Sequence, residues 1–436
     1  MNLRSNNMKK KTKFLFVAGL AICSLFVSCS ADDDDDSPSN GGVYYNPSSG
    51  EYEVYNGAGG DMKGDAPEMG GTGPSGEASG FDGGGDKTGD PNDRMSNRLT
   101  AGEWNDLDNW KFWTNLLNQN DYYDKTSYWK FTPKSVVAVK VVDADSNAIA
   151  NVPVELLDGE AVEYAAKTDN SGLAYCWVGL FGNKDLNSMR LSLKINGVPY
   201  EETFKYTTKK DTALNLNIIV NKEINHPEPK ADVAFIVDAT GSMGDEIDFL
   251  ISDLGYIIDH AGSNRKVTLR TAALFYRDED DEYLTRHNDF ADDVAVTQKF
   301  VSQQRADGGG DYPEAVHTAL AESLQKLSWN ESARARIAFL ILDAPAHHYE
   351  TVIASLQKSI ALYAKNGIKI IPVAASGVDK DTEFMLRFFD IATGGTYVFL
   401  TDDSGIGNSH IEASVGDYEV EHLADLMVRL IKKYTE

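Results

Sequence analysis

Apolar residues in the second half of the chain occur in continuous runs separated by amphipathic stretches. The runs cover residues 233–237, 271–276, 337–342, 368–375 and 396–400. Runs unbroken by polar residues are typical of strands buried on both faces of a parallel sheet. The stretches between them repeat apolar residues at the spacing of one helix face. They cover residues 247–258, 316–327, 349–366, 382–393 and 420–434. This alternation predicts a doubly wound, mostly parallel α/β sheet over residues 231–436, with binding sites at the carboxyl ends of its strands.

From residue 135 to residue 224 the pattern changes to short alternating runs separated by turn residues. Examples are SVVAVKVV, VPVELLDG, RLSLKING and LNLNIIV. Several short strands at such intervals predict an all-β sandwich over residues 135–224. The V-P-V-E-L run and the later T-D-N-S-G-L-A resemble the carboxypeptidase regulatory-like and Cna-B-like sandwiches, which implies a spacer domain.

The segment at residues 99–134 is dense in aromatic residues. Its large apolar side chains recur at helical spacing, at Trp104, Leu107, Trp110, Trp113 and Leu117. We expect a helical segment that docks on the next domain. A surface that stacks on sugars is the alternative.

Residues 1–28 have the pattern of a lipoprotein signal peptide. A cluster of lysines precedes an apolar run at residues 14–27, which is too short for a comfortable membrane-spanning helix. The run ends in Val-Ser-Cys, which resembles the lipobox of bacterial lipoproteins. This resemblance implies that Cys29 is lipidated and becomes the mature N-terminus. A plain signal peptide followed by an incidental cysteine is the alternative.

Residues 29–98 are rich in Gly, Ser, Asp and Pro and predict a flexible acidic tether. The aspartate run at residues 32–36 resembles the export signal that carries some lipoproteins to the outer face of the outer membrane. A solvated spacer is the alternative interpretation of this run. The sequence therefore predicts a lipid-anchored, surface-exposed outer-membrane protein whose contact with the membrane is the anchor alone.

The net charge narrows the class of partner, and the cysteine count bears on disulfides. The net charge of −26 disfavours nucleic acid, because phosphates select basic proteins. After removal of the signal and lipidation of Cys29, only Cys176 remains, in the apolar stretch LAYCWVGL. One thiol cannot form an intrachain disulfide, so we expect Cys176 to be buried and inert.

Oxygen-bearing side chains follow the predicted central strands. The first strand ends in Asp238, and Thr240 and Ser242 follow at alternate positions. A carboxylate and two hydroxyls are hard donors that suit Mg²⁺, Mn²⁺ or Ca²⁺. Asp343 ends another central strand, and Asp311 follows three glycines before a predicted helix. Loops at the carboxyl ends of parallel strands meet at one edge of the sheet, so the sequence predicts a divalent-metal site there.

These residues also have structural interpretations. Ser242 and Asp245 have the spacing of a capping box at a helix start. Asp311 is placed to be a helix N-cap, with Pro313 and Glu314 in the first turn. Metal binding and capping by Asp311 are compatible, and both remain open.

Together the three loops resemble the metal-ion-dependent adhesion site of the von Willebrand factor type A domain, over residues 231–436. The family pattern is Asp-x-Ser-x-Ser, then a threonine, then an aspartate. Asp238, Thr240 and Ser242 match the first loop. Asp343 matches the third loop, whereas Asp311 stands at the position of the threonine. The motifs GGGDYPE and DAPAHH resemble a bacterial and protist branch of the family. The resemblance implies a site of these five residues, with Mg²⁺ as the preferred ion and Ca²⁺ or Mn²⁺ as alternatives.

Two further clusters are weaker candidates. His347, His348 and Glu350 carry transition-metal ligand types, but adjacent histidines point in different directions. The acidic stretch RDEDDEY at residues 277–283 lacks the spacing and the glycine of a calcium loop. We expect it to be a solvated loop.

The resemblance implies a binding module rather than an enzyme. A protein partner would supply a carboxylate or another oxygen donor to the ion. Two alternatives stay open: a metal-dependent hydrolase at the same site, and a structural envelope protein with a vestigial site. The hydrolase would need a general base, for which His347 or His348 is available.

Overall fold

The computed structural model describes residues 42–46, 51–55, 99–182, 189–200, 213–219, 227–263, 266–310, 312–402 and 412–436. The chain divides into two compact units, residues 1–85 and residues 86–436. In the first unit β1 (Gly42–Asn46) and β2 (Glu51–Tyr55) form an antiparallel hairpin within the segment expected to be a tether. Cys29 and the aspartate run that follows it lie outside the described residues.

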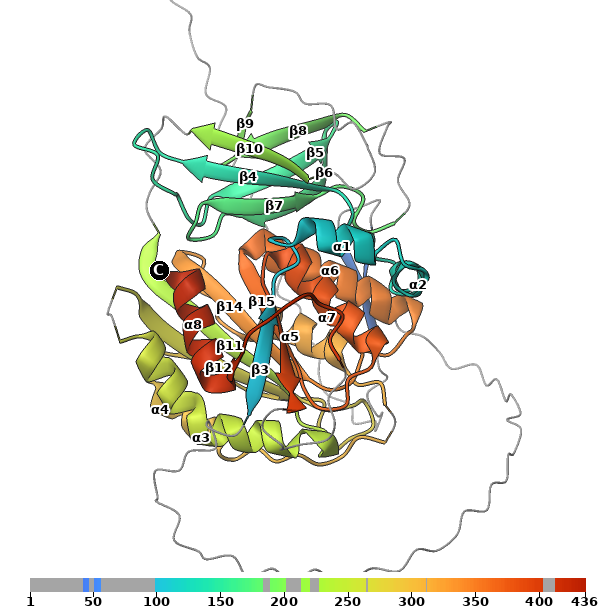
Figure 1. Cartoon of the computed structure of the whole chain (residues 1–436), viewed down its shortest axis with the longest axis vertical. Helices are drawn as coiled ribbons and strands as arrows, with labels where there is room; N and C mark the ends of the chain where they lie inside the picture. Colours follow the sequence, from blue (N-terminus) through green and yellow to red (C-terminus); the bar gives the residue numbers. More distant parts are fainter. Residues whose placement is uncertain are drawn as a thin grey trace, which may run out of the picture. The chain divides into compact units, whose positions relative to one another are not determined.

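The second unit contains an eight-stranded sheet with the order β13-β12-β11-β14-β15-β16-β3-β17 (Figure 1). The pairs from β12 to β16 are parallel. The strands expected from the apolar runs are β11 (Glu228–Asp238), β12 (Thr268–Tyr276), β14 (Ala333–Leu342), β15 (Ile368–Ala374) and β16 (Tyr397–Thr401). The doubly wound α/β fold is therefore confirmed. An antiparallel edge strand, β13 (Thr285–Ala291), was not expected from the sequence.

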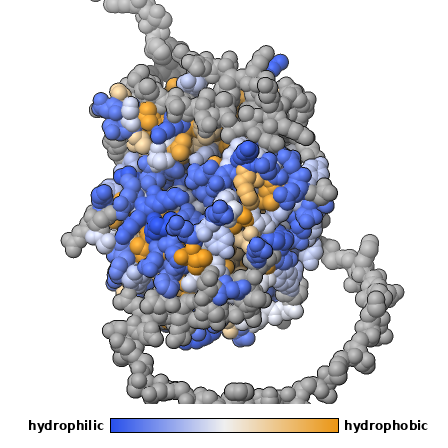
Figure 2. Space-filling model, viewed as in Figure 1, coloured by the Kyte–Doolittle hydropathy of each residue, from blue (hydrophilic) through white to orange (hydrophobic). Residues whose placement is uncertain are grey.

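Helices cover both faces of this sheet. The side chains of β11 are therefore buried on both faces, which explains why the strand is apolar. Its residues Val233, Phe235 and Val237 pack in one core with α3 and α8. Ile236 lies in the core on the other face, with α5, α6 and α7. The helices are α3 (Gly244–Ala261), α4 (Val294–Val301), α5 (Val316–Lys326), α6 (Glu350–Asn366), α7 (Lys380–Thr393) and α8 (Leu423–Thr435). On the face that Figure 2 shows, hydrophilic residues predominate and apolar residues form scattered patches.

One strand of the sheet comes from a distant part of the chain. β3 (Thr100–Trp104) pairs antiparallel with β16 and, on its other edge, with β17 (Val420–His422). The sheet therefore extends beyond the range 231–436 expected from the sequence. Trp104 was expected on a helix, but it lies in β3. Pairing with the edge of β16 outweighs the helical spacing of its aromatic neighbours.

The segment after β3 packs against α7. It forms the short helices α1 (Trp110–Leu116) and α2 (Asn120–Tyr128). Trp113 is fully buried, and its ring stacks on Phe384 of α7 with centroids 6.2 Å apart. Phe131 stacks on Phe388 of α7 with centroids 3.4 Å apart. The segment therefore packs on α7, which belongs to the eight-stranded-sheet region and not to the domain that follows the segment in the chain.

A buried ion pair also joins this segment to α7. Arg387 Nη2 and Nε donate to Asp106 Oδ1 and Oδ2 at 2.6 and 2.9 Å, and neither side chain is exposed. Asp106 Oδ1 also accepts the indole N–H of Trp104 at 3.0 Å. Burial opposes the charge on Arg387, but Asp106 holds the pKa of the guanidinium above its usual value. The pair therefore compensates two charges that would otherwise be costly to bury.

Two small sheets are inserted in the chain between β3 and β11, with the orders β10-β4-β7 and β6-β5-β8-β9. Their strands are β4 (Val136–Val142), β5 (Pro153–Asp158), β6 (Ala161–Lys167), β7 (Leu173–Trp177), β8 (Leu191–Ile195), β9 (Val198–Pro199) and β10 (Ala213–Ile219). Val139 and Leu156, from different sheets, share one core with the buried thiol of Cys176. The region expected to be a β-sandwich therefore contains β-sheets that share a core. The Tyr164 hydroxyl attaches it to α7 by donating to the carbonyl of Ala392 at 2.9 Å.

We predict that Asp106→Asn destabilises the fold by about 3 kcal/mol, because it removes the closer of two buried carboxylates from Arg387 and leaves only Glu383, at 3.5 Å. Asp108→Asn is the control, since Asp108 is exposed two residues further on. Denaturant unfolding of both variants measures the difference. Equal stability of the two variants would show that the ion pair does not hold the segment.

Candidate metal centre

Asp238 ends β11 at the carboxyl edge of the sheet, followed by a tight turn into the helix Gly241–Met243. The backbone N–H and the hydroxyl of Thr240 both donate to Asp238 Oδ1, at 2.9 and 2.8 Å. Asp238 is fully buried, yet its Oδ2 atom accepts no hydrogen bond. One carboxylate oxygen therefore orients the loop. The other accepts no hydrogen bond of normal geometry, although the hydroxyl of Tyr276, the residue paired with Asp238 across the sheet, is a neighbouring donor that lowers the pKa of Asp238.

Asp343 lies at the same edge, directly after β14. β11 and β14 are paired in parallel, with Val237 opposite Ile341, so both aspartates leave the sheet side by side. Asp343 is 7% exposed, whereas Ser242 is exposed. Burial raises the pKa of Asp343, and a hydrogen bond from Ser242 opposes this effect. The structure thus brings Asp238, Thr240, Ser242 and Asp343 to the same edge of the sheet.

The glycine loop closes against the first loop. Gly308 and Gly309 have φ of 80° and 74°, a region that favours glycine. The N–H of Gly241 donates to the carbonyl of Gly308 at 3.2 Å. A methyl group on Gly309 would lie 3.2 Å from the side chain of Thr240. Asp311 follows this loop and lies outside the described residues, so its roles as ligand and as cap both stay predictions.

Buried carboxylates make the centre strongly electronegative. Burial raises the pKa of Asp238 to about 7, and the charge of Asp343 adds to this rise against the hydrogen bonds of Thr240. Burial also raises the pKa of Glu246, on α3, to about 7. Such shifts indicate that the metal-free site lacks a compensating positive charge.

The donors fit a divalent ion. Within the described part of the chain, no group of three or more His, Cys, Asp or Glu side chains is placed to hold a metal. The candidate centre instead combines two carboxylates with two hydroxyls, a set of hard oxygens that suits Mg²⁺. The Oδ2 of Asp238, which accepts no hydrogen bond of normal geometry, is the atom that such an ion would satisfy.

The histidine cluster does not converge. His347 Nε2 lies 2.7 Å from Asp278 Oδ1. His348 Nε2 lies 2.9 Å from the carbonyl oxygen of Tyr128, on whose ring it stacks. Glu350 forms its ion pair elsewhere, with Lys130. These three side chains therefore do not form a transition-metal site.

Glu314 is a buried carboxylate of this region that sequence reasoning assigned to a helix turn. α5 begins at Val316, so Glu314 precedes the helix and is 3% exposed. A parallel bridge joins it to Ala346, in the loop that follows Asp343. The sequence feature that could have identified Glu314 is its place in GGGDYPE, close to the glycine loop.

Comparison with known proteins identifies the class of this domain. Residues 232–384 match the model of the von Willebrand factor A domain. The part of the chain that carries the candidate metal centre is therefore a von Willebrand factor A domain.

More distant similarities cover part of the chain. The putative ariadne-like RING finger protein R811 of Acanthamoeba polyphaga mimivirus is 33% identical over 117 residues, which span 27% of this chain and 11% of that protein. Proximal thread matrix protein 1 from the mussel byssus has a TM-score of 0.32 at 12% identity, over 48% of this chain and 47% of that one. The open conformation of the pilus adhesin SpaC from Lactobacillus rhamnosus GG has a TM-score of 0.34 at 12% identity, over 49% of this chain and 31% of that one.

The raised pKa of Asp238 predicts that the metal-free protein loses stability as pH rises. Between about pH 4 and about pH 7 the folded protein retains a proton that the unfolded chain releases, so the free energy of unfolding falls across this window. Asp238→Asn has no such proton and should remove this part of the slope. Asp248→Asn, on the exposed side of α3, is the control and should keep it. Denaturant unfolding in EDTA across the window measures both slopes, and identical slopes would contradict the prediction.

Proposed function

We propose that this chain is a cell-surface binding protein whose von Willebrand factor A domain engages a partner through a metal-ion-dependent adhesion site. The observation that supports the proposal most directly is Asp238 Oδ2, a buried carboxylate oxygen that accepts no hydrogen bond of normal geometry at the end of a central strand. Burying such an atom is costly unless it has a ligand. A strand-end aspartate with a purely structural role would have both oxygens satisfied.

Asp238, Thr240, Ser242 and Asp343 would hold the ion, with Asp311 as a further candidate. When bound, a divalent ion supplies an open position that attracts an oxygen atom. The proposed partner is a protein that presents a carboxylate or another oxygen donor to it. Mg²⁺ is the ion proposed first, with Ca²⁺ and Mn²⁺ as alternatives, because every donor is a hard oxygen.

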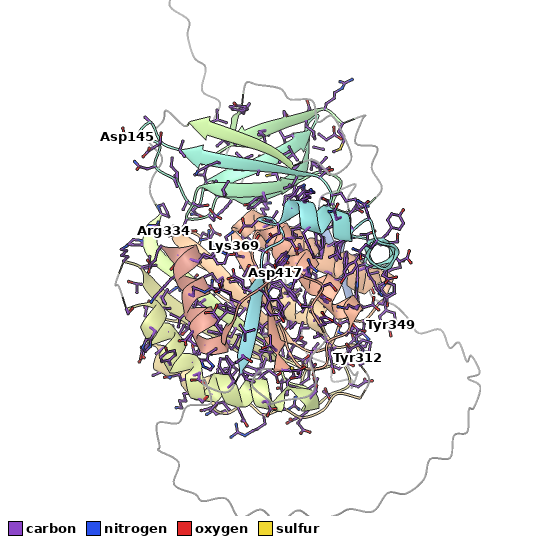
Figure 3. The ribbon with its side chains drawn as sticks, viewed as in Figure 1. Asp145, Tyr312, Arg334, Tyr349, Lys369 and Asp417 are labelled. Carbon is purple, nitrogen blue, oxygen red and sulfur yellow. The ribbon has the colours of Figure 1, made fainter. Side chains whose placement is uncertain are left out.

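Exposed aromatic side chains beside the site support a protein partner. Tyr312 is 43% exposed and follows Asp311, and Tyr349 is 61% exposed in the loop after β14. Figure 3 shows both at the same edge of the view. The Tyr312 hydroxyl accepts the backbone N–H of Asp379 at 3.1 Å, which fixes the ring in place. Fixed tyrosines offer contact area at little entropic cost, as is common in protein interfaces.

Hydrolysis at the same site is the alternative function, and His347 is the residue it would use. Asp278 orients this imidazole through its Nε2 atom, so the other ring nitrogen would have to face a substrate. We favour binding, because the imidazole of His347 also stacks on the ring of Tyr349, with centroids 5.7 Å apart. Turnover of phosphate or carboxylic esters that Asp238→Ala abolishes would support hydrolysis instead.

The proposed location is the outer membrane, with a lipid anchor at Cys29 and the A domain exposed at the cell surface. No helix among the described residues is long and apolar enough to cross a bilayer. The anchor rests on the sequence alone, through the apolar run and Val-Ser-Cys.

Divalent metal should raise the melting temperature of the protein. A ligand that binds only the folded state stabilises it by about 2.7 kcal/mol at roughly a hundredfold excess over its Kd. Asp238→Ala should abolish the response to Mg²⁺, while Asp248→Ala should retain it. Thermal scans with Mg²⁺ and with EDTA test this. A response in Asp238→Ala equal to that of the wild type would place the ion elsewhere.

Mass spectrometry should find the mature N-terminal peptide starting at a diacylated Cys29. Cys29→Ser should leave the signal peptide uncleaved or release the protein from membranes. An N-terminal peptide that begins at another residue, or one with a free Cys29 thiol, would contradict the proposed anchor.

A further inference from the structure

A small cavity lies where the two small sheets meet the eight-stranded sheet. Its volume is about 20 Å³, which gives room for about one or two buried oxygen atoms. Residues of β6 and β7 line one side, and residues of β14, β15, α6, α7 and α8 line the other. Figure 3 shows two of them, Arg334 and Lys369, at this junction. Lys167 and Tyr175 are only half-buried, which leaves a route from solvent.

The cavity is separate from the candidate metal centre. Arg334 and Arg336 lie near the start of β14, whereas Asp343 follows the end of this strand. A strand rises about 3.3 Å per residue, so Arg336 and Asp343 are roughly 20 Å apart. A ligand in the cavity would therefore not depend on the proposed metal.

Positive charges dominate the lining of the cavity. Among the described residues that form it, four are cations, and Asp169 is the one carboxylate. Asp169 is already paired, because its Oδ2 atom lies 3.1 Å from Lys369 Nζ. The other three cations are Lys167, Arg334 and Arg336, in a chain whose net charge is −26. A concentration of positive charge in so acidic a protein indicates a place for an anion.

Arg336 is a buried cation whose hydrogen bonds supply no countercharge. It is 3% exposed. Its Nε atom donates to a backbone carbonyl at 2.9 Å, its Nη1 atom donates to two more at 2.8 and 2.9 Å, and its Nη2 atom donates to the Asn151 side chain. A guanidinium has five N–H donors, so these bonds leave one N–H of Nη2. Burial lowers the pKa of Arg336 to about 10 despite the charges of Asp232 and Glu331.

Lys167 brings a second cation to the same place from the other side of the junction. Gly367 ends α6 with φ of 67°, and a methyl group on it would lie 2.9 Å from Lys167 Cβ and 3.4 Å from Arg336 Nη2. The two side chains therefore flank one glycine. Burial and then the charge of Arg336 lower the pKa of Lys167, and only the charge of Glu331 opposes this effect. Two like charges from different sheets are thus held near one another, which is unfavourable unless an anion compensates them.

Arg334 supplies a further donor. Its Nε atom is buried and donates no hydrogen bond of normal geometry, while its Nη2 atom donates to the backbone oxygen of Glu436 at 2.6 Å. Arg334 and Arg336 are two residues apart on one strand, so they project from the same face of β14. A buried N–H group without an acceptor is costly, and an oxyanion in the cavity would accept from it.

We propose that this cavity is a binding site for a small carboxylate, held by Lys167, Arg334 and Arg336. The planar guanidinium fork matches the two oxygens of a carboxylate. The cavity has room for these two oxygens but not for all the oxygens of a phosphate group. Lys167 belongs to β6 and the arginines belong to β14, so the bound anion would bridge the small sheets and the eight-stranded sheet. The site would therefore strengthen this attachment in addition to binding its ligand.

Calorimetric titration of the purified full chain with acetate, in EDTA at constant ionic strength, tests the site. Lys167→Gln removes one charge from the cavity and should weaken acetate binding by about tenfold or more, since hydrogen bonds between charged groups are the stronger ones. Lys140→Gln is the matched control, because Lys140 is an exposed lysine of β4. The control should stay within about twofold of the wild type. Unchanged affinity in Lys167→Gln, or an equal loss in both variants, would overturn the proposal.

Melting experiments give a second readout that a structural role of Lys167 would not produce. In sodium chloride, Lys167→Gln should melt above the wild-type temperature, because it relieves repulsion between two cations. In saturating acetate at the same ionic strength the order should reverse, since the variant gains less from the anion. A lysine that only packs would shift the melting temperature in the same direction in both solutions, and that result would overturn the proposal.

Titration with inorganic phosphate separates a carboxylate site from a general anion site. Phosphate should bind more weakly than acetate, because the cavity cannot enclose it. Phosphate binding without acetate binding would overturn the carboxylate assignment, and a wild-type protein that binds neither would overturn the site altogether. If Lys167→Gln fails to fold, electron density from wild-type crystals soaked in acetate decides the question. A carboxylate within hydrogen-bond distance of Arg334 Nε supports the proposal, and a cavity without one overturns it.

Discussion

The parallel pairing of β11 with β14 is the constraint on which the candidate site depends. Val237 lies opposite Ile341, so the two strands end together and place Asp238 and Asp343 at one edge of the sheet. Apolar side chains on both faces of the strands fix this register, since they must meet helices on each side. The loops that carry the polar donors are thus positioned by packing that involves none of the donors themselves.

This position has an electrostatic consequence. The end of β11 is buried, so Asp238 is held where water cannot solvate it and its pKa rises to about 7. A divalent ion would restore its ionised form. Asp311 as a further ligand would bring the carboxylates to three, which exceeds the charge of such an ion and would reduce its attraction for a further anion. Neutral oxygens of a partner, such as amide carbonyls or hydroxyls, would then compete well with a carboxylate for the open position.

The sequence predicted those parts of the fold that local periodicity specifies. The five central strands, their helices and the meeting of Asp238 with Asp343 all follow from apolar runs and strand ends. β3 could not be predicted, because Thr100–Trp104 becomes a strand only by pairing with β16, almost 300 residues away. Glu314 was missed for a similar reason. Its sequence neighbours suggest a helix start, and only its bridge to Ala346 shows that it lies beside the loop that follows Asp343.

The place of β3 in the chain changes how the domains are connected. The two small sheets lie between β3 and β11 in the chain, and both of these strands belong to the eight-stranded sheet. Under the proposed anchoring at Cys29, the chain from the tether would enter the eight-stranded sheet first and reach the small sheets afterwards. In the chain the small sheets are therefore an insertion into the sheet that carries the candidate site, and Tyr164 attaches them to α7. Tension on the tether would act on β3, which the buried Asp106–Arg387 pair and its pairing with β16 and β17 hold in the sheet.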